Sequence, residues 1–176
     1  AFGRRTREDA ELPPQLVWGE DFDTVRPLEI PAADFIIEQL NRYPGEVTVI
    51  SVGPVTNIGD VIRKDPSAWK KVKQVYSMFG SFYMGYDTGP VPDAEWNVRA
   101  DIESAKLFMT SGVPITLAGL DVTTMVKFDR DRREAIAMRN SPLTDAVCGL
   151  YSLWARGNMN ASPTLFDPVA VAMFLG

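Results

Sequence analysis

The stretch EVTVISVGPVTNIGDVIRKDP, residues 46–66, begins with a β-branched run, turns at Gly53–Pro54 and ends at Asp65–Pro66. The β-branched run predicts a strand, and the segment after the turn predicts a short helix. The same order then recurs, since KVKQVYSM predicts a second strand, DIESAKLFMTSG a helix and VPITLAGL a third strand. This alternation predicts right-handed crossovers and an α/β fold, with a mostly parallel sheet and flanking helices.

The segments on either side extend this pattern. IPAADFIIEQLNRYPG predicts a helix before the first strand, and residues 1–29 carry no sustained period, so we expect an irregular surface segment there. From Asp129 onward we expect two helices around Ser141–Pro142, a loop at 157–164 and a final helix from Asp167. We interpret residues 1–176 as a single α/β domain, the central part of a longer one, because Ala1 is not an initiator and FDPVAVAMFLG stops inside an apolar helix.

Composition excludes several function classes. The net charge is −5 and no long run of one sign occurs, so the chain lacks the basic stripe of a nucleic-acid or anionic-membrane surface. No apolar run is long enough to span a bilayer, and the single cysteine, Cys148, cannot form an intrachain disulfide. The chain has no histidine, which excludes histidine triads and the usual zinc sites within it. A small neutral or cationic ligand fits better, and the compartment stays open.

In parallel sheets, ligands bind outside the carboxyl ends of the strands, so the loops after the three strands are where we expect a site. The second loop, FGSFYMGYDTGPVPDAEWN, is long for such a connection and carries Glu95 and Asn97. Two interpretations stay open for this pair. They are helix-capping or turn residues, or they bind a polyhydroxylated ligand such as a sugar, because a carboxylate accepts from neighbouring hydroxyls while an amide both donates and accepts.

Other polar residues at strand and helix ends favour a structural role on pattern alone. Thr56 or Asn57 is suited to capping the helix after the first strand, and Asp121 and Thr123 stand where a cap is expected after the third. Asp167 precedes a proline at a helix start, which is typical of a cap. The alternative for Asp167 is an anionic ligand for a hard cation such as calcium.

Five separated segments, in order, resemble nucleoside hydrolases of the inosine/uridine-preferring superfamily: VTVISVGPVTNIGDVIRKDP, VYSMFG, AEWNVRADIESAK, VPITLAGLDVT and FDPVAVA. The resemblance covers about residues 46–176, and residues 1–45 match only loosely. It implies a nucleoside hydrolase fold with a Rossmann-like core. It also implies hydrolysis of the N-glycosidic bond of a ribonucleoside through an oxocarbenium-like transition state, with Ca²⁺ holding the ribose, and a homodimer or homotetramer.

The resemblance also implies roles for particular residues. Glu95 and Asn97 would bind ribose hydroxyls, and Met78 would lie beside the sugar. The main-chain carbonyl of Val52 and the carboxylate of Asp167 would ligate calcium. Trp154 falls where the family has an aromatic residue flanking the base, and an indole ring suits base stacking.

The sequence departs from the family at three places. The signature D-x-D-P-G-x-D-D, which supplies most calcium ligands and the general base, is absent, so the catalytic base is unknown. This fits a chain that lacks its first βα units, a site completed by a second subunit, or a catalytically inactive homologue that binds a nucleoside or sugar. Phe166 stands where the family commonly has a histidine, which indicates base stacking or a different substrate. The family's ribose-binding asparagine aligns near Gly89, which removes one expected ribose contact.

Overall fold

The computed structural model describes residues 13–19 and 24–176. Its contacts divide the chain into two compact units. The first unit contains Pro27–Val126 and Leu165–Gly176, and the second contains Lys127–Thr164 with the described residues before Pro27. The expectation of a single domain over residues 1–176 stays a prediction.

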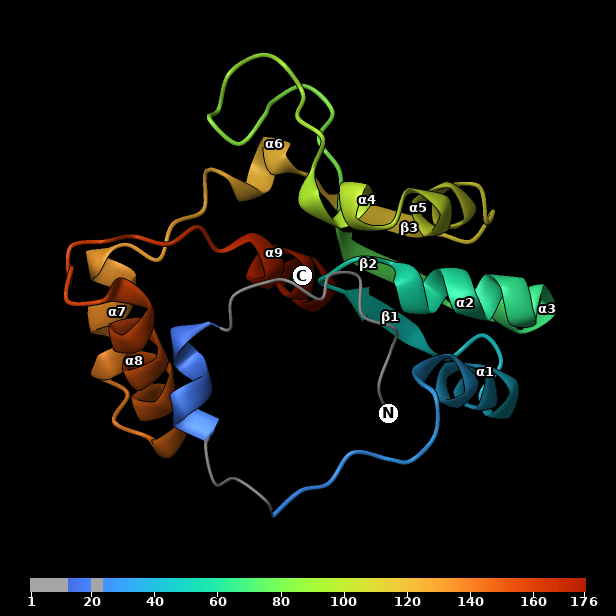
Figure 1. The fold of residues 1–176 in the computed structure, drawn as a ribbon, viewed down its shortest axis with the longest axis horizontal. Helices are drawn as coiled ribbons and strands as arrows, with labels where there is room; N and C mark the ends of the chain where they lie inside the picture. Colours follow the sequence, from blue (N-terminus) through green and yellow to red (C-terminus); the bar gives the residue numbers. More distant parts are fainter. Residues whose placement is uncertain (1–12, 20–23) are drawn as a thin grey trace. The chain divides into compact units, whose positions relative to one another are not determined.

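The first unit is built on a three-stranded parallel sheet. The strands are β1 (Thr48–Ser51), β2 (Gln74–Met78) and β3 (Ile115–Ala118), in the spatial order β1-β2-β3. Thr48 is opposite Gln74, and Val75 is opposite Ile115. Consecutive strands are therefore neighbours joined by helical crossovers (Figure 1), and the predicted α/β fold is confirmed.

The side chains of the sheet alternate between two apolar faces, as the period of two in a strand requires. On one face, α9 (Phe166–Leu175) contacts all three strands, and the ring of Phe174 lies edge-on to Tyr76 at 6.0 Å between centroids. On the other face, the fully buried Val75 packs in a cluster with Leu40 and Phe108 from flanking helices. Both faces of the sheet are covered, as is usual for a parallel sheet.

The sequence predicts the longer helices of this unit and misses the short ones. Its helices besides α9 are α1 (Ala32–Arg42), α2 (Thr56–Lys64), α3 (Pro66–Trp69), α4 (Trp96–Ala100), α5 (Ile102–Met109) and α6 (Leu120–Thr123). The helices α3, α4 and α6 have four or five residues, which is too short for a helical period to show. The predicted cap at Thr56 or Asn57 is wrong, because Val55 is the N-cap of α2 and no side chain caps that end.

The second unit contains a 3₁₀ helix, η1 (Pro14–Gly19), and the helices α7 (Arg130–Ala137) and α8 (Pro142–Ala155). The two helices around Ser141–Pro142 are confirmed, with Ser141 and Thr144 forming a reciprocal capping box. Part of the segment expected to be irregular is thus helical, and η1 packs against α8. Among the described residues, no helix is long and apolar enough to cross a membrane.

A substitution at Gly59 on α2 tests how closely α2 packs against α5. A Cβ atom at Gly59 would lie 2.2 Å from Oγ of Ser104 and 3.0 Å from its Cα, so a methyl group has no room. Gly59→Ala is expected to destabilise the complete protein by about 1–3 kcal/mol, despite the better helix propensity of alanine. The measurement is the urea midpoint.

The matched control is Lys64→Ala on the same helix, which removes an exposed ion pair with Asp34 and should change the stability by about 1 kcal/mol or less. An equal or higher midpoint for Gly59→Ala would contradict the close approach of α2 and α5.

Candidate active site

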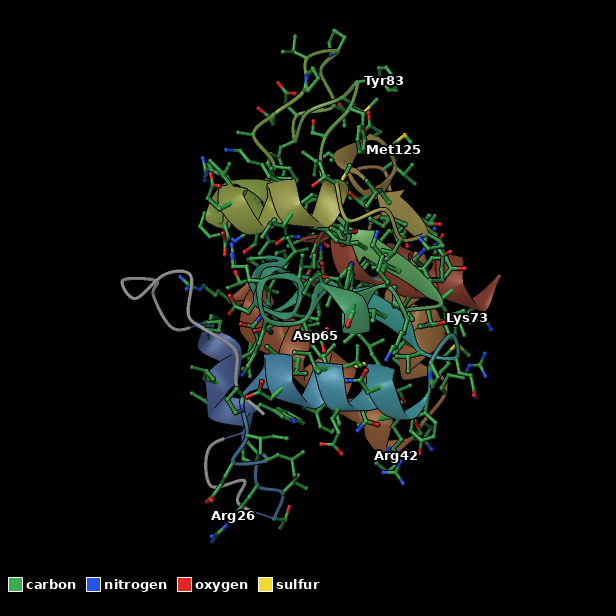
Figure 2. All side chains as sticks on the ribbon, turned by 90° about the vertical axis from the view of Figure 1, so that its right-hand side faces the viewer. Arg26, Arg42, Asp65, Lys73, Tyr83 and Met125 are labelled. Atoms are coloured by element: carbon green, nitrogen blue, oxygen red, sulfur yellow. The ribbon has the colours of Figure 1, made fainter. Side chains whose placement is uncertain are left out.

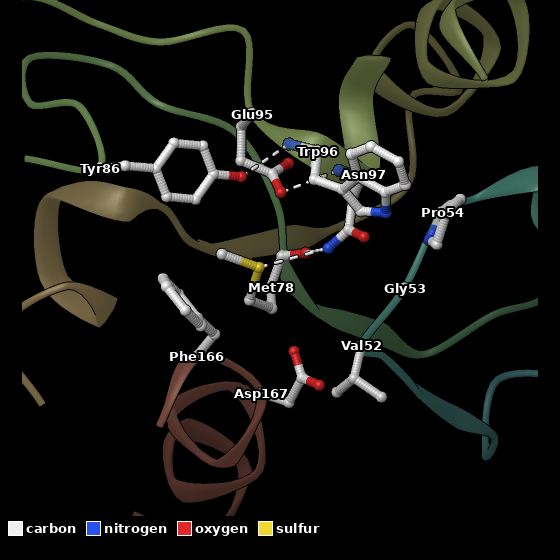
Figure 3. Close-up of a pocket in the computed structure, with 10 residues that line it drawn as sticks. All are labelled: Val52, Gly53, Pro54, Met78, Tyr86, Glu95, Trp96, Asn97, Phe166 and Asp167. Atoms are coloured by element: carbon white, nitrogen blue, oxygen red, sulfur yellow. Dashed lines mark hydrogen bonds between the residues drawn. The ribbon is translucent and has the colours of Figure 1, made fainter. Parts of the chain in front are cut away.

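A pocket of about 380 Å³ opens at the carboxyl ends of β1 and β2, in the first unit. This volume falls in the usual range for small-molecule sites, roughly 300–1,000 Å³. Figure 3 shows its lining, which consists of Val52, Gly53, Pro54, Met78, Tyr86, Glu95, Trp96, Asn97, Phe166 and Asp167. The structure therefore brings together six of the residues singled out from the sequence: Val52, Met78, Glu95, Asn97, Phe166 and Asp167.

Glu95 is buried, with 2% of its surface exposed, and its carboxylate is the N-cap of α4. Oε1 accepts the backbone N–H of Asn97 at 2.8 Å, and Oε2 accepts those of Val98 at 3.2 Å and Gly80 at 3.1 Å. The capping interpretation is thus confirmed for Glu95, and ligand binding by the same side chain stays a prediction. An ionised carboxylate offers about four lone-pair positions, so one on Oε1 is still available to the pocket.

Asn97 is also buried and is oriented by the end of β2. Its Nδ2 donates to the carbonyl oxygen of Met78 at 3.0 Å and contacts the Met78 sulfur at 3.3 Å. Among the described residues no hydrogen bond reaches Oδ1, which lies on the pocket side in Figure 3. The amide oxygen is thus presented as an acceptor for whatever fills the pocket.

Asp167 lies in the first turn of α9, but it is not the cap that the sequence suggested. The N-cap position is Leu165, and no side chain caps this end. The pKa of Asp167 is raised above its ordinary value by burial and then by the negative charge of Glu95. Two carboxylates thus face one pocket whose lining contains no lysine or arginine, an environment that favours a bound cation.

Two aromatic side chains form one wall of the pocket. Tyr86 and Phe166 pack edge to face with ring centroids 6.1 Å apart, and the Tyr86 hydroxyl oxygen accepts the backbone N–H of Trp96 at 2.9 Å. Sequence reasoning missed Tyr86 and Trp96, as well as the turn residues Gly53 and Pro54. The sequence does show that the long loop after β2 is rich in aromatic residues, but this composition does not indicate which ring lines the pocket.

The loop that carries Tyr86 is held by Asp121, at the second residue of α6. Its Oδ1 accepts the backbone N–H of Tyr83 at 2.6 Å and of Met84 at 3.1 Å, and its Oδ2 accepts that of Phe82 at 3.0 Å. Burial raises the pKa of Asp121, but these hydrogen bonds outweigh it and leave the pKa below the ordinary value. The predicted structural role is present, whereas the helix cap is wrong, because Gly119 is the N-cap of α6.

Trp154 lies on α8, in the second unit, where its ring lies 6.2 Å from that of Tyr151. It does not line the pocket described above. Its assignment as a base-stacking residue stays a prediction. The aromatic wall seen in the first unit comes instead from Tyr86 and Phe166.

Comparison with known proteins identifies the family. Residues 4–176 match the family described as inosine-uridine preferring nucleoside hydrolase. The chain belongs to this family. The match begins at residue 4 and so also includes most of the segment before residue 46, where the sequence resembles the family only loosely.

Curated relatives of this nucleoside hydrolase chain include plant proteins. It is 36% identical over 157 residues to probable uridine nucleosidase 2 of Oryza sativa subsp. japonica, covering 85% of this chain and 45% of that protein. It is 32% identical over 172 residues to uridine nucleosidase 1 of Arabidopsis thaliana, covering 96% of this chain and 48% of that protein. The chain thus spans slightly less than half the length of these relatives.

Solved nucleoside hydrolases share the fold. A plant nucleoside hydrolase superposes with a TM-score of 0.78 at 23% identity, covering 97% of this chain and 57% of that one. A purine-preferring ribonucleoside hydrolase from Gardnerella vaginalis superposes with a TM-score of 0.77 at 21% identity, covering 98% of this chain and 60% of that one. At these identities the likeness supports the α/β fold alone.

The hold of Asp121 on the loop can be tested by hydrogen exchange. Asp121→Asn leaves one acceptor oxygen where the carboxylate has two, so the amides of Phe82, Tyr83 and Met84 are expected to exchange about tenfold faster or more. The control is Asp87→Asn, since among the described residues the Asp87 carboxylate accepts only the N–H of Gly89, within the same loop. Unchanged exchange at residues 82–84 in Asp121→Asn would contradict this role.

Proposed function

We propose that the complete protein hydrolyses the N-glycosidic bond of ribonucleosides, releasing ribose and a free base, and that this pocket holds the ribose. The observation that carries the proposal is the convergence of Glu95, Asn97 and Asp167 on one pocket at the strand ends. The names of the plant relatives make uridine the first substrate to assay, with inosine beside it. Nucleoside catabolism or purine salvage would then be its setting.

The polar groups of the pocket suit a sugar with vicinal hydroxyls. Oδ1 of Asn97 and the remaining lone pair on Oε1 of Glu95 are both acceptors for hydroxyl protons. Both side chains are held by backbone hydrogen bonds, so little reorganisation is needed when a ligand binds. As the glycosidic bond breaks, positive charge develops on the ribose ring, and the carboxylates of Glu95 and Asp167 would stabilise it electrostatically.

The oxygen atoms of the pocket are also of the type that binds a hard cation. Asp167 supplies a carboxylate, Val52 lies beside it in the lining, and calcium prefers such oxygen ligands. The residues described contain no cluster of three or more acidic, cysteine or histidine ligands, so further oxygens from substrate, water or other residues would be needed. A bound calcium would orient the ribose hydroxyls and the attacking water. Asp167 and the Val52 carbonyl are the groups of this chain that would hold it.

A second candidate function is a homologue that binds a nucleoside or sugar without hydrolysing it. The observation that favours it is the absence of D-x-D-P-G-x-D-D from the 176 residues, which leaves the general base unassigned. Retention of uridine or ribose by the complete protein without release of free base would support this second function over the first. Assembly as a homodimer or homotetramer stays a prediction under both.

Asp167→Ala tests the metal assignment. In the complete protein this change is expected to weaken calcium binding and to slow base release from uridine by more than about 100-fold, because a direct ligand should cost at least as much as its supporting contacts. Calorimetry with calcium and chromatography of the released base are the measurements. The matched control is Asp131→Ala, since Asp131 holds the same first-turn position on α7. Full activity after chelation and in Asp167→Ala would refute the assignment.

Glu95→Gln tests ribose binding. It keeps the shape of the side chain but removes its charge and one acceptor oxygen, so ribose affinity is expected to fall about tenfold or more while free-base affinity changes little. Asp101→Asn is the control, because Asp101 is the acidic N-cap of α5 and is not part of the pocket lining. Equal losses for ribose and free base would count against a ribose contact.

A further inference from the structure

Tyr86 brings the only phenolic hydroxyl among the residues that line the pocket. Its oxygen accepts the backbone N–H of Trp96, so that bond occupies a lone pair and leaves the hydroxyl proton uncommitted. In the part of the chain that the structure describes, no acceptor takes this proton. Figure 3 shows the Tyr86 ring in the pocket wall, with its hydroxyl end directed toward Glu95 and Trp96. A hydroxyl with one fixed bond and a free proton is a hydrogen-bond donor to a ligand.

The ring is held firmly enough for this task. The backbone N–H of Tyr86 donates to Oδ2 of Asp93 at 2.7 Å, and its ring packs edge to face on Phe166. The backbone N–H of Asp93 in turn donates to Oγ of Ser81, which links the end of the loop to its start. With Asp121 holding residues 82–84, the loop fixes Tyr86 from both sides.

Breaking an N-glycosidic bond leaves an electron pair on the base nitrogen, and a proton donor is needed where that anion is poorly stabilised. The carboxyl oxygens of Glu95 are acceptors for three backbone N–H groups, so this side chain is committed to accepting hydrogen bonds. Asp167 is the proposed cation ligand. The other lining residues, Val52, Gly53, Pro54, Met78, Trp96, Asn97 and Phe166, carry no comparable acidic proton.

The electrostatic surroundings suit a donor. Burial raises the pKa of Tyr86 above that of a free phenol, so the group is protonated at neutral pH. The N–H of Trp96 lowers this pKa, the negative charge of Glu95 raises it, and the charges of Arg99 and Asp93 act in opposite directions, so Trp96 and Arg99 are the groups that would stabilise the phenolate formed when the proton leaves. The guanidinium carbon of Arg99 lies over the Trp96 ring, 5.3 Å from the ring centroid.

We propose that Tyr86 protonates the departing base. The bond between C1′ and the base nitrogen breaks, the electron pair stays on the base, and the hydroxyl proton of Tyr86 is transferred to it. Water adds to C1′ and releases one proton, and the phenolate takes one proton back from solvent, so the sum is nucleoside plus water giving ribose plus base. This step rests on the proposed hydrolysis and adds the leaving-group acid to it.

The test compares two leaving groups in the complete protein. Tyr86→Phe keeps the ring but removes the proton, so hydrolysis of uridine and inosine is expected to fall by at least about 100-fold. Hydrolysis of para-nitrophenyl β-D-riboside, whose leaving group is a stable anion, should stay close to the wild-type rate. The control is Tyr83→Phe in the same loop, because Tyr83, labelled in Figure 2, is 83% exposed and outside the pocket lining.

Each outcome decides the matter. Loss with the nucleosides and retention with the nitrophenyl riboside supports Tyr86 as the acid and shows that the variant is folded. Equal losses with both substrates, or no loss with either, overturn the role of Tyr86 while the proposed hydrolysis stands. If the wild-type protein releases neither base nor nitrophenol, the proposed function fails and the role of Tyr86 fails with it.

Discussion

The carboxylate of Glu95 joins the parts of the chain on which the pocket depends. It accepts N–H groups from Gly80, just beyond β2, and from the first turn of α4. These bonds place Asn97 against the Met78 carbonyl at the end of β2, and so they determine where the amide oxygen stands. A buried carboxylate is costly to desolvate unless such donors satisfy it. The carboxylate of Glu95 therefore serves both the fold and the site, because it caps a helix and keeps one lone pair available as an acceptor for a ligand.

The parallel sheet explains why much of this arrangement was predictable. β-Branched runs indicated the strands, and parallel strands place their carboxyl ends at one edge, so the loops after the strands were expected to form the site. Val52 and Met78 came from the family resemblance, and they lie at this edge. Glu95 and Asn97 were expected at the same edge because they lie in the loop after the second strand. Phe166 and Asp167 came from the family resemblance, and they line the same pocket. These residues lie on or directly beside regular elements, whose geometry the sequence pattern captures.

The missing parts depend on contacts distant in sequence or on very short elements. Tyr86 is placed by loop hydrogen bonds and by Phe166, which is 80 residues away in the chain, and no local period reports such a contact. Asp121 bonds residues 82–84 across the fold, so its pattern as a cap was misleading. The helix α4 has five residues, too few for a helical period to show, so the sequence left the capping role of Glu95 as one of two interpretations. Local sequence patterns thus predicted the strands and longer helices, whereas the position of Tyr86 in the pocket wall depends on tertiary contacts.

The central claim is that this pocket holds ribose between the amide of Asn97, the carboxylate of Glu95 and a cation at Asp167. A crystal structure of the complete protein, grown with calcium and a nucleoside analogue that resists hydrolysis, tests it most directly. The account predicts ribose hydroxyls about 3 Å from Oδ1 of Asn97 and from Oε1 of Glu95, with calcium bound to Asp167 and the Val52 carbonyl. A nucleoside bound elsewhere, or calcium remote from Asp167, would contradict it.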